Sequence, residues 1–396
     1  MKRRIGLAED YESTRSRGLV VSALGIAQTL AWASSYYLPA ILADPISKSI
    51  GVPSAWVFAA FSAALLIAAF AGPAVGRVID RSGGRGVLML SNVVLAAGLI
   101  ALAAANGAFM LFAAWAVLGI GMALGLYDAG FAALTALYGH NARGPITGIT
   151  LFAGFASTVS WPLSTVLNDA LGWRETVLVW AAINLVIGLP LNFLLPAPAR
   201  LPHARRAAEH STGWKPYREM VLLAFVFAAV WFVTGAMASH LPGLLERAGA
   251  TPLQAVFAAA LVGPAQVAAR LVEFFVLRRS HPLVSARVAA LLHPLGAVIF
   301  AVIGPTSAVA FAVLYGAGNG LLTIARGTVP LAVFGPHGYG ERTGLLGAPA
   351  RAAQALAPLL FGLLLDQMGA SVIVVSAGLC VASFAALLLL RTSPPD

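Results

Sequence analysis

Long apolar runs, separated by short segments that carry Arg, Gly and Pro, dominate the sequence. They fall near residues 18–43, 54–79, 86–105, 108–138, 145–168 and 174–195, and then near 220–245, 253–276, 284–303, 307–334, 344–365 and 370–390. Their lengths suit the ~20 residues that a helix needs to cross a bilayer. Because the runs are continuously apolar and do not alternate, they indicate helices and not strands. The pattern predicts an all-α membrane protein with twelve transmembrane helices.

The polar intervals divide this chain into parts. Residues 196–219, rich in Pro, Arg and His, are predicted to link a six-helix bundle at 18–195 to a second one at 220–391. Residues 1–17 and 392–396 are predicted to be tails on the cytoplasmic side. The first apolar run is too long for the core of a signal peptide, so we expect it to be the first membrane helix.

Composition supports the membrane assignment. Only 10% of the residues are charged and 59% are hydrophobic, whereas a soluble domain carries about 25% charged residues. The single cysteine, Cys380, excludes an internal disulfide and a cysteine metal cluster. The histidines are scattered, with no metal-binding spacing, and no nucleophile set falls within the membrane. We therefore expect no cofactor, no metal and no enzymatic activity.

The positions of the basic residues predict the orientation in the membrane. With the N-terminus inside, only Lys48, Arg174 and Arg247 fall in outer segments, and the other basic residues outside the apolar runs fall in inner ones. This bias predicts that both termini are cytoplasmic. It also accounts for the net charge of +10 without nucleic acid as a partner. The compact loops are typical of a protein of the bacterial inner membrane.

The two halves of the chain repeat each other. Residues 37–42 (Tyr-Leu-Pro-Ala-Ile-Leu) pair with 240–245 (His-Leu-Pro-Gly-Leu-Leu), and Asp169 pairs with Asp366 within a similar motif. Further pairs in chain order keep an offset between 203 and 197. Such parallel repeats are typical of transporters that hold their substrate between two halves near the middle of the membrane.

One loop carries a recognisable motif. The spacing Gly-x-x-x-Asp-Arg-x-Gly-x-Arg occurs at Gly76, Asp80, Arg81, Gly83 and Arg85. It resembles the loop between the second and third helices of the major facilitator superfamily of transporters. The resemblance implies that these residues hold helix ends together on the cytoplasmic side and release them as the transporter changes state. It also implies alternating access and a monomer. The arginines serve as topology charges as well.

Charged residues within the apolar runs are the candidates for function, because a charge inside the bilayer is costly. They are Asp128, Arg270, Glu273, Arg326 and Arg351. Counting from Arg279 and Arg342 places Arg270 and Arg351 roughly 13 Å from the inner boundary. Guanidinium groups match carboxylates, so the two could clamp an anionic substrate. Alternatively, Glu273 neutralises Arg270 at i+3, and Arg351 bonds helix carbonyls or Gln354.

A narrower resemblance supports the anion interpretation. The arginine pair, the segment Ser49 to Ser54 and the sequence Gly172-Trp173-Arg174 resemble the monocarboxylate porters and oxalate:formate antiporters. In that branch an arginine in the eighth helix, and in the antiporter a lysine in the eleventh, contact the substrate. Here Arg270 and Arg351 match those places, and arginine stands where the antiporter has lysine.

Asp128 and Arg326 lie one position apart when the repeats are superposed. We expect them to pair across the central cavity as an inner gate. An unpaired Asp128 would instead have a raised pKa and could carry a proton. The alternative is that each is satisfied within its own half, through Tyr127 or Asn319.

Aromatic residues complete the candidate set. Tyr37 and its repeat partner His240 are expected to face the cavity as a polar pair, with Trp32 deeper, and could hold a carboxylate and its apolar part. Packing or interface roles are the alternative for each.

The sequence thus predicts a transporter of a small organic anion, a mono- or dicarboxylate, in the lipid bilayer. Proton symport, exchange and facilitated diffusion all stay open as its mode of transport. A drug or toxic-compound exporter is the alternative function, and a membrane sensor lacks an output domain.

Overall fold

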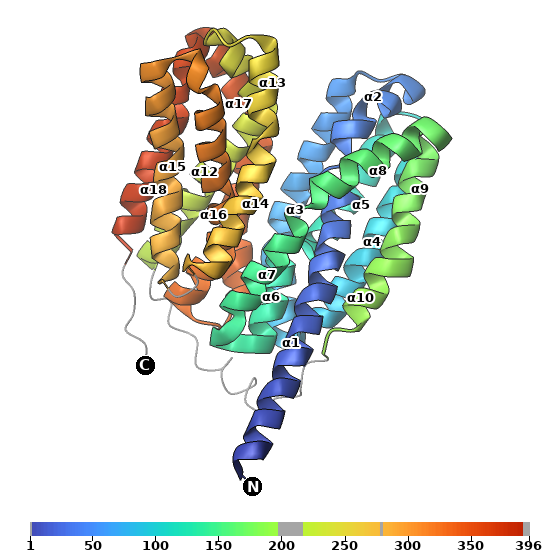
Figure 1. The fold of residues 1–396 in the computed structure, drawn as a ribbon. Helices are drawn as coiled ribbons and strands as arrows, with labels where there is room; N and C mark the ends of the chain where they lie inside the picture. The colour runs from blue at the N-terminus through green and yellow to red at the C-terminus, as the bar shows by residue number, and fades with distance from the viewer. Residues whose placement is uncertain (1, 197–216, 278–279, 391–396) are drawn as a thin grey trace.

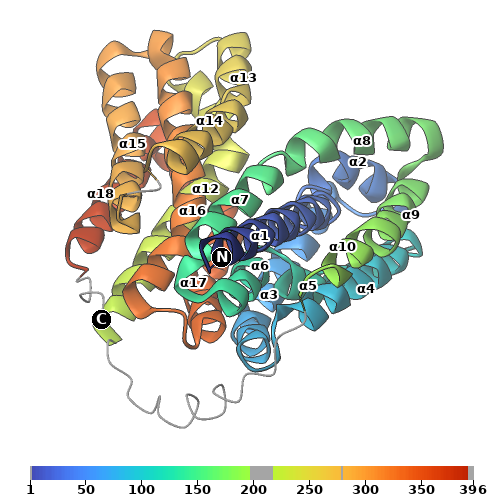
Figure 2. The same ribbon diagram turned by 60° about the horizontal axis from the view of Figure 1, so that its bottom comes forward.

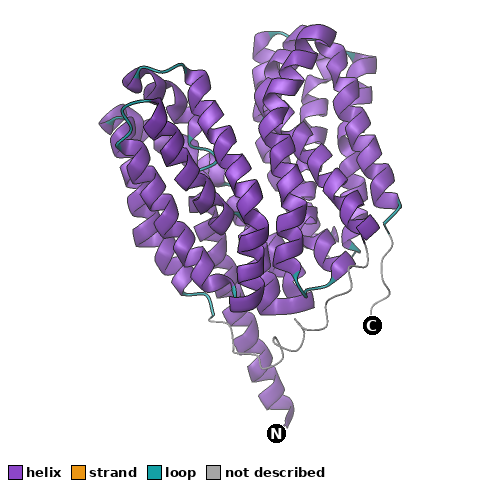
Figure 3. Ribbon diagram, turned by 180° about the vertical axis from the view of Figure 1, so that it is seen from behind, coloured by secondary structure: helices purple, strands orange, loops and turns teal. Residues whose placement is uncertain are grey.

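The computed structural model describes residues 2–196, 217–277 and 280–390. Within these ranges the protein consists of helices and the turns between them, with no strand (Figure 3). The predicted tail at 392–396 and most of the predicted linker at 196–219 lie outside the described residues. Residues 2–17, predicted to be a tail, continue the first helix.

The helices form two bundles (Figure 1). The first bundle contains α1 (Lys2–Ala33), α2 (Pro39–Ile50), α3 (Ser54–Ser82), α4 (Gly84–Ala103), α5 (Ala108–Gly125), α6 (Tyr127–Tyr138), α7 (Arg143–Ala153), α8 (Ala156–Leu171), α9 (Trp173–Ile183) and α10 (Leu189–Phe193). The second contains α12 (Tyr217–Arg247), α13 (Pro252–Ala260), α14 (Val262–Phe275), α15 (Pro282–Ile303), α16 (Ala308–Phe334), α17 (Tyr339–Met368) and α18 (Ile373–Leu388).

In the described residues, nine helical stretches are long and apolar enough to cross a membrane. Two of them, Ala108–Leu171 and Tyr339–Leu388, are 64 and 50 residues long. Each is far longer than the ~20 residues of one crossing. Glycines with positive φ interrupt both stretches, at Gly139 and Gly369. The all-helical membrane fold is therefore confirmed, and the count of twelve stays a prediction.

Each bundle has its own apolar core. One cluster of buried residues fills the first bundle, from Val20 to Leu195, and extends to Leu331 and Tyr339 of the second; two further clusters fill the second bundle. Large apolar side chains such as Phe70 and Phe109 are exposed on the outside. Apolar side chains thus occur both in the cores and on the outer surface. A lipid environment permits this, because the bilayer is as apolar as the core.

The bundles meet at the end of the molecule where α1 begins and α18 ends, here called the terminal end (Figure 2). There α17 packs against α3 and α6, and α7 packs against α14 and α16. Three helices of this region are interrupted in mid-course, at Leu126, at Gly154 and at Leu261. Asp128 lies beside the interruption at Leu126, and Arg351 lies on α17.

Candidate functional site

Asp128 lies next to the interruption between α5 and α6. Leu126 is extended, with φ −84° and ψ −171°, so the helix restarts at Tyr127 and places Asp128 in the first turn of α6. The Gln28 side-chain amide donates to the Gly125 carbonyl at the end of α5, at 2.6 Å. A helix start offers free backbone amides and a positive dipole end. The break therefore creates a favourable position for a carboxylate inside the bilayer.

The Asp128 carboxylate joins the two bundles. Its Oδ2 accepts a hydrogen bond from Arg326 Nη2 of α16 at 2.7 Å and another from Arg351 Nη2 of α17. Arg351 Nη1 also donates to the Ala68 carbonyl of α3 at 2.8 Å. The Arg326 guanidinium lies 4.8 Å from the centre of the Trp231 ring. The predicted contact between Asp128 and Arg326 is thus present, and its role as a gate stays a prediction.

Arg351 reaches Asp128 because their helices run in opposite directions. Side chains on a helix lean toward its N-terminus. The helix α17 starts at the terminal end, so Arg351 leans toward that end, whereas Asp128 on α6 leans away from it. The two side chains converge.

The expected clamp of Arg270 and Arg351 is not formed, for the same reason. The helix α14 runs toward the terminal end, so Arg270 leans the other way and contacts the first bundle at α7. Its Nη1 donates to the Thr150 carbonyl at 3.2 Å, beside the interruption at Gly154. Its Nε is buried and has no partner among the described residues. Arg270 and Arg351 therefore bind at different places between the bundles, Arg270 at the Thr150 carbonyl and Arg351 at Asp128.

A pocket lies above the ion cluster, on the side away from the terminal end. Its volume is about 360 Å³, including the part open at its mouth. It is lined by Trp32, Tyr36, Leu65, Ala68, Met122, Leu126, Tyr127, Asp128, Trp231, Arg326, Arg351 and Gln354. The Gln354 side-chain amide donates to Tyr36 Oη at 2.7 Å, which is a second contact between the bundles. The pocket thus combines two arginines, one carboxylate and four aromatic rings.

Of the aromatic candidates, Trp32 lines the pocket, and Tyr37 and His240 do not. The buried Nε1 of Trp32 has no partner among the described residues. Tyr37 packs in an aromatic cluster, with ring centres 5.3 Å from Tyr36 and 6.1 Å from Trp161. His240 Nε2 lies 2.7 Å from the Pro358 carbonyl within its own bundle. The structure therefore does not bring Tyr37 and His240 together as the expected pair.

The loop motif lies at the terminal end, against the start of α17. Asp80 Oδ1 and Oδ2 accept hydrogen bonds from the backbone amides of Gly340 and Glu341, at 2.8 and 2.9 Å. Asp80 therefore caps a helix of the other bundle. Arg77 pairs with Glu341 at 3.2 Å, with both side chains half-exposed.

The other motif residues have separate roles. A β-carbon on Gly76 would lie 2.0 Å from the Gly340 carbonyl oxygen, so only glycine permits this crossing of α3 and α17. Gly83 has φ 78°, in the region that favours glycine, and forms the turn. Arg85 lies over the Phe193 ring within its own bundle. Arg81 is exposed and makes no polar contact with the described residues.

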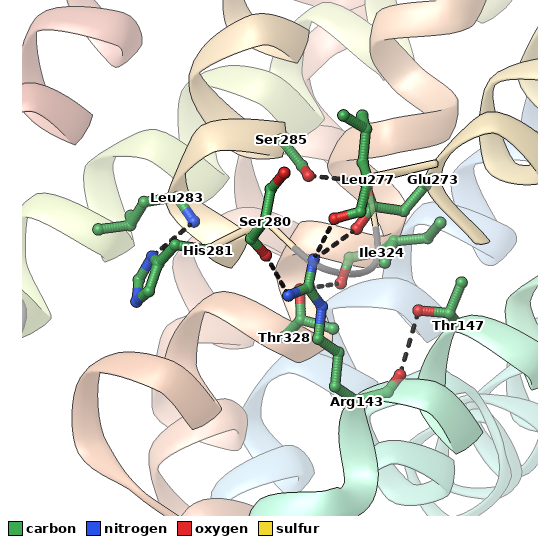
Figure 4. Close-up of polar contacts among 10 residues, drawn as sticks. All are labelled: Arg143, Thr147, Glu273, Leu277, Ser280, His281, Leu283, Ser285, Ile324 and Thr328. Atoms are coloured by element: carbon green, nitrogen blue, oxygen red, sulfur yellow. Dashed lines mark hydrogen bonds and ion pairs between the residues drawn. The ribbon is translucent and has the colours of Figure 1, made fainter. Parts of the chain in front are cut away.

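A second contact at the terminal end was not predicted. Arg143, at the start of α7, donates to Glu273 Oε1 of α14 at 3.0 Å, to the Leu277 carbonyl at 3.1 Å and to the Ser280 carbonyl (Figure 4). Glu273 is 1% exposed, and its other oxygen accepts from Ser285 Oγ at 2.6 Å. Glu273 therefore neutralises Arg143 of the other bundle and not Arg270.

Comparisons with known proteins agree with this architecture. A family model described as Major Facilitator Superfamily matches residues 24–337. An uncharacterised 38 kDa protein from Thermoproteus tenax is 28% identical over 351 residues, which cover 81% of this chain and 89% of that protein. A protein named MFS-type efflux pump from Mycolicibacterium smegmatis is 27% identical over 60% of this chain and 56% of its own length.

Solved structures share the fold at low sequence identity. The human organic anion transporter MFSD10 superposes with a TM-score of 0.69 at 17% identity, over 94% of this chain and 99% of its own. The transporter FucP in its outward conformation superposes with a TM-score of 0.74 at 13% identity, over 96% of this chain and all of its own.

Proposed function

Because the chain belongs to the major facilitator superfamily, we propose that it moves a small organic anion, a mono- or dicarboxylate, by alternating access. It is a multi-pass membrane protein and a transporter, not an enzyme. Twelve crossings in two repeats, cytoplasmic termini, a bacterial inner membrane and a monomeric state belong to the proposal. The resemblance to the monocarboxylate and oxalate:formate branch belongs to it as well.

The charge balance between the bundles supports an anionic substrate. Arg270, Arg326 and Arg351 are buried there, and Asp128 is the carboxylate that contacts two of them. The remaining buried carboxylate of this region, Glu273, is engaged by Arg143. Buried cations without matching negative charge are costly in a bilayer. An anion in the pocket beside Arg351 and Arg326 reduces that cost, and this observation carries the proposal.

Contacts between the bundles are the basis for the proposed gating. In the proposed cycle, Asp80, Gly76 and Arg77 on α3 hold the start of α17, and Glu273 holds Arg143, while the pocket faces the side away from the terminal end. These contacts and the pair Asp128–Arg326 separate when the pocket opens to the terminal end.

An exporter of toxic compounds is the second candidate. One relative carries the name MFS-type efflux pump, and Trp32, Tyr36, Tyr127 and Trp231 give the pocket aromatic walls. Such rings can stack on a lipophilic cation. The two arginines in the pocket disfavour a cation, however, so the anion is the proposal that the charges favour.

A ligand panel on purified protein tests the choice. Small mono- and dicarboxylates and lipophilic cations are compared by thermal shift on the wild type, Arg351→Gln, Arg270→Gln and Arg287→Gln. Arg287 is a matched control, because it donates to the Leu387 carbonyl within its own bundle. A ligand at 100 times its Kd stabilises the folded state by about 2.7 kcal/mol.

We expect a carboxylate to raise the unfolding temperature of the wild type and of Arg287→Gln, with the shift lost in Arg351→Gln and reduced in Arg270→Gln. A shift with cations alone, or a carboxylate shift that Arg351→Gln retains, contradicts the anion proposal and favours the exporter.

A further inference from the structure

The ion cluster in the pocket has an unequal number of charges. Arg326 and Arg351 contribute two positive charges and Asp128 one negative charge, and all three side chains are at least nine-tenths buried. The three groups together therefore carry one positive charge. Arg270 does not line the pocket and instead contacts the Thr150 carbonyl.

Only one of the two carboxylate oxygens of Asp128 is hydrogen-bonded to the described residues. Both guanidinium groups donate to Oδ2, and Oδ1 forms no hydrogen bond with the described residues. Asp128 lines the pocket, so a ligand or a proton that enters the pocket can reach its carboxylate. The carboxylate is thus both a fixed part of the cluster and accessible to what the pocket holds.

From this arrangement we infer that Asp128 sets the charge of the anion that the pocket accepts. The inference rests on the proposed anion transport and names the preferred substrate class, a carboxylate with one negative charge. A monoanion brings the cluster to neutrality with Asp128 ionised. A dianion leaves one negative charge in excess, and it binds only with one proton, which passes from solvent to the Asp128 carboxylate.

The surroundings of Asp128 favour this difference between the binding of a monoanion and the binding of a dianion with a proton. An excess negative charge in a buried site raises the proton affinity of the nearest carboxylate. The titratable and charged groups around Asp128 are Arg326 on α16, Arg351 and Tyr339 on α17, Tyr127 next to Asp128 on α6, and Tyr36, which follows α1 and lines the same pocket. None of these protein groups is a second carboxylate, so Asp128 is the carboxylate among the described residues that can take the proton.

Ligand pairs that differ only in charge test the inference. Succinate is compared with succinamate, and terephthalate with 4-carbamoylbenzoate, so that each dianion has a monoanion of the same shape. Affinities are measured by calorimetry at about pH 7.5, where both carboxyl groups are ionised, in two buffers of different ionisation enthalpy. The buffer dependence of the enthalpy reports protons taken up on binding.

The wild type gives the first expected result, and it needs no variant. We expect the monoanion of the pair that binds to be preferred over the dianion, and the dianion to take up about one proton per molecule bound. Equal affinities within the pair, with no proton uptake by the dianion, overturn the inference.

Three variants then assign the effect to Asp128. In Asp128→Asn the cluster carries two positive charges, so we expect the dianion-to-monoanion preference to rise at least about tenfold and the proton uptake to vanish. In Asp128→Asn combined with Arg326→Gln the cluster returns to one positive charge, and the preference for the monoanion returns. Asp366→Asn removes an exposed carboxylate that pairs with Arg247 within the second bundle, outside the pocket, and it is expected to leave the preference unchanged.

The outcomes separate the two levels of the proposal. If carboxylates bind but Asp128→Asn keeps the preference of the wild type, Asp128 does not select charge, and the anion transporter stands. If no carboxylate binds the wild type and lipophilic cations do, the proposed function fails and this inference fails with it.

Discussion

Gly76 of α3 and Gly340 of α17 face each other where the two bundles cross at the terminal end. A β-carbon on Gly76 would lie 2.0 Å from the Gly340 carbonyl oxygen, and one on Gly340 would lie 2.5 Å from the Gly76 carbonyl oxygen. One turn farther along, a β-carbon on Gly344 would lie 2.6 Å from the Gly72 carbonyl oxygen. At this crossing, α3 and α17 therefore pack main chain against main chain.

Replacing Gly76 by Ala is expected to separate the bundles at the terminal end. Overpacking of this kind costs about 1–3 kcal/mol, and it acts only on the state in which α3 and α17 touch. The measurement is the rate at which Thr135→Cys, at a position 2% exposed on α6, reacts with a thiol reagent in a Cys380→Ser background. Gly86→Ala is the control, because its β-carbon meets no atom within 4 Å. Equal labelling rates in the two variants contradict the prediction.

Asp80 and Arg81 are neighbours in the motif and are expected to differ in effect. Asp80→Asn leaves one acceptor oxygen for two backbone amides, and the loss of a helix cap costs about 1–2 kcal/mol. Arg81→Gln removes an exposed side chain and is expected to be neutral. Hydrogen exchange of the peptide that begins at Tyr339 reports the change directly, since Gly340 and Glu341 donate to Asp80. Faster exchange in Arg81→Gln than in Asp80→Asn would refute this assignment.

The Arg143–Glu273 pair is expected to contribute more to the free energy of unfolding than the Arg77–Glu341 pair. Glu273 is 1% exposed and Arg143 22%, whereas both partners of the second pair are more than 40% exposed. Breaking a buried pair costs about 3–5 kcal/mol, and exposed pairs give about 0–1 kcal/mol.

Double-mutant cycles with glutamine at all four positions measure the two coupling energies from unfolding in detergent. Similar coupling energies for the two pairs would show that burial does not distinguish them.

Gly154→Ala is expected to displace Arg270. The new β-carbon would lie 2.3 Å from Arg270 Nη1, so the guanidinium loses its place at the Thr150 carbonyl. We expect a loss of stability of about 1–3 kcal/mol that is smaller when Arg270→Met removes the clashing group. Thermal unfolding of the two single variants and the double variant measures this rescue. Gly144→Ala, with open space at its β-carbon, is the control. Strictly additive effects of Gly154→Ala and Arg270→Met would exclude the contact.

His281, between α14 and α15, is expected to give a small loss of stability in acid. Burial, together with the charges of Arg143 and Arg287, lowers the pKa of His281 from its usual 6.5. Its Nδ1 accepts from the Leu283 amide at 3.2 Å, which caps α15 and requires an unprotonated Nδ1. The folded state therefore favours neutral His281. Its contribution is complete above pH 6.5 and is lost as the pH falls through the lower, folded-state pKa.

Unfolding temperatures between about pH 8 and pH 5 measure this loss. His281→Asn keeps a capping side chain without a titration, so its stability is expected to fall less over the same range. A decline as steep as that of the wild type would assign the effect to another group.

The helices could be predicted from the sequence because a continuous apolar run in a membrane must satisfy its backbone hydrogen bonds internally, as a helix does. The predicted runs 54–79 and 307–334 correspond to α3 (Ser54–Ser82) and α16 (Ala308–Phe334). The contact of Asp128 with Arg326 could also be predicted, because the internal repeat places both residues at equivalent positions.

Contacts that depend on side-chain direction could not be predicted from depth alone. Arg351 meets Asp128, and Arg270 turns away from both, because α17 and α14 run in opposite directions. From the sequence, Arg143 is one of the inner basic residues that indicate topology, and nothing in its flanking sequence indicates that a buried Glu273 lies opposite. One signal was present in the sequence: the spacing of 340, 344, 347, 351 and 354 places Gly, Gly, Gly, Arg and Gln on one face of α17.

The two contacts at the terminal end differ in what they require of homologous sequences. Arg143 and Glu273 recognise each other by side chain, so replacement of one favours a compensating replacement of the other. Asp80 recognises only the backbone amides of Gly340 and Glu341, which every residue except proline supplies. Among relatives of this chain, correlated substitution is therefore expected between positions 143 and 273. Position 80 is expected to keep its carboxylate while position 341 varies independently of it.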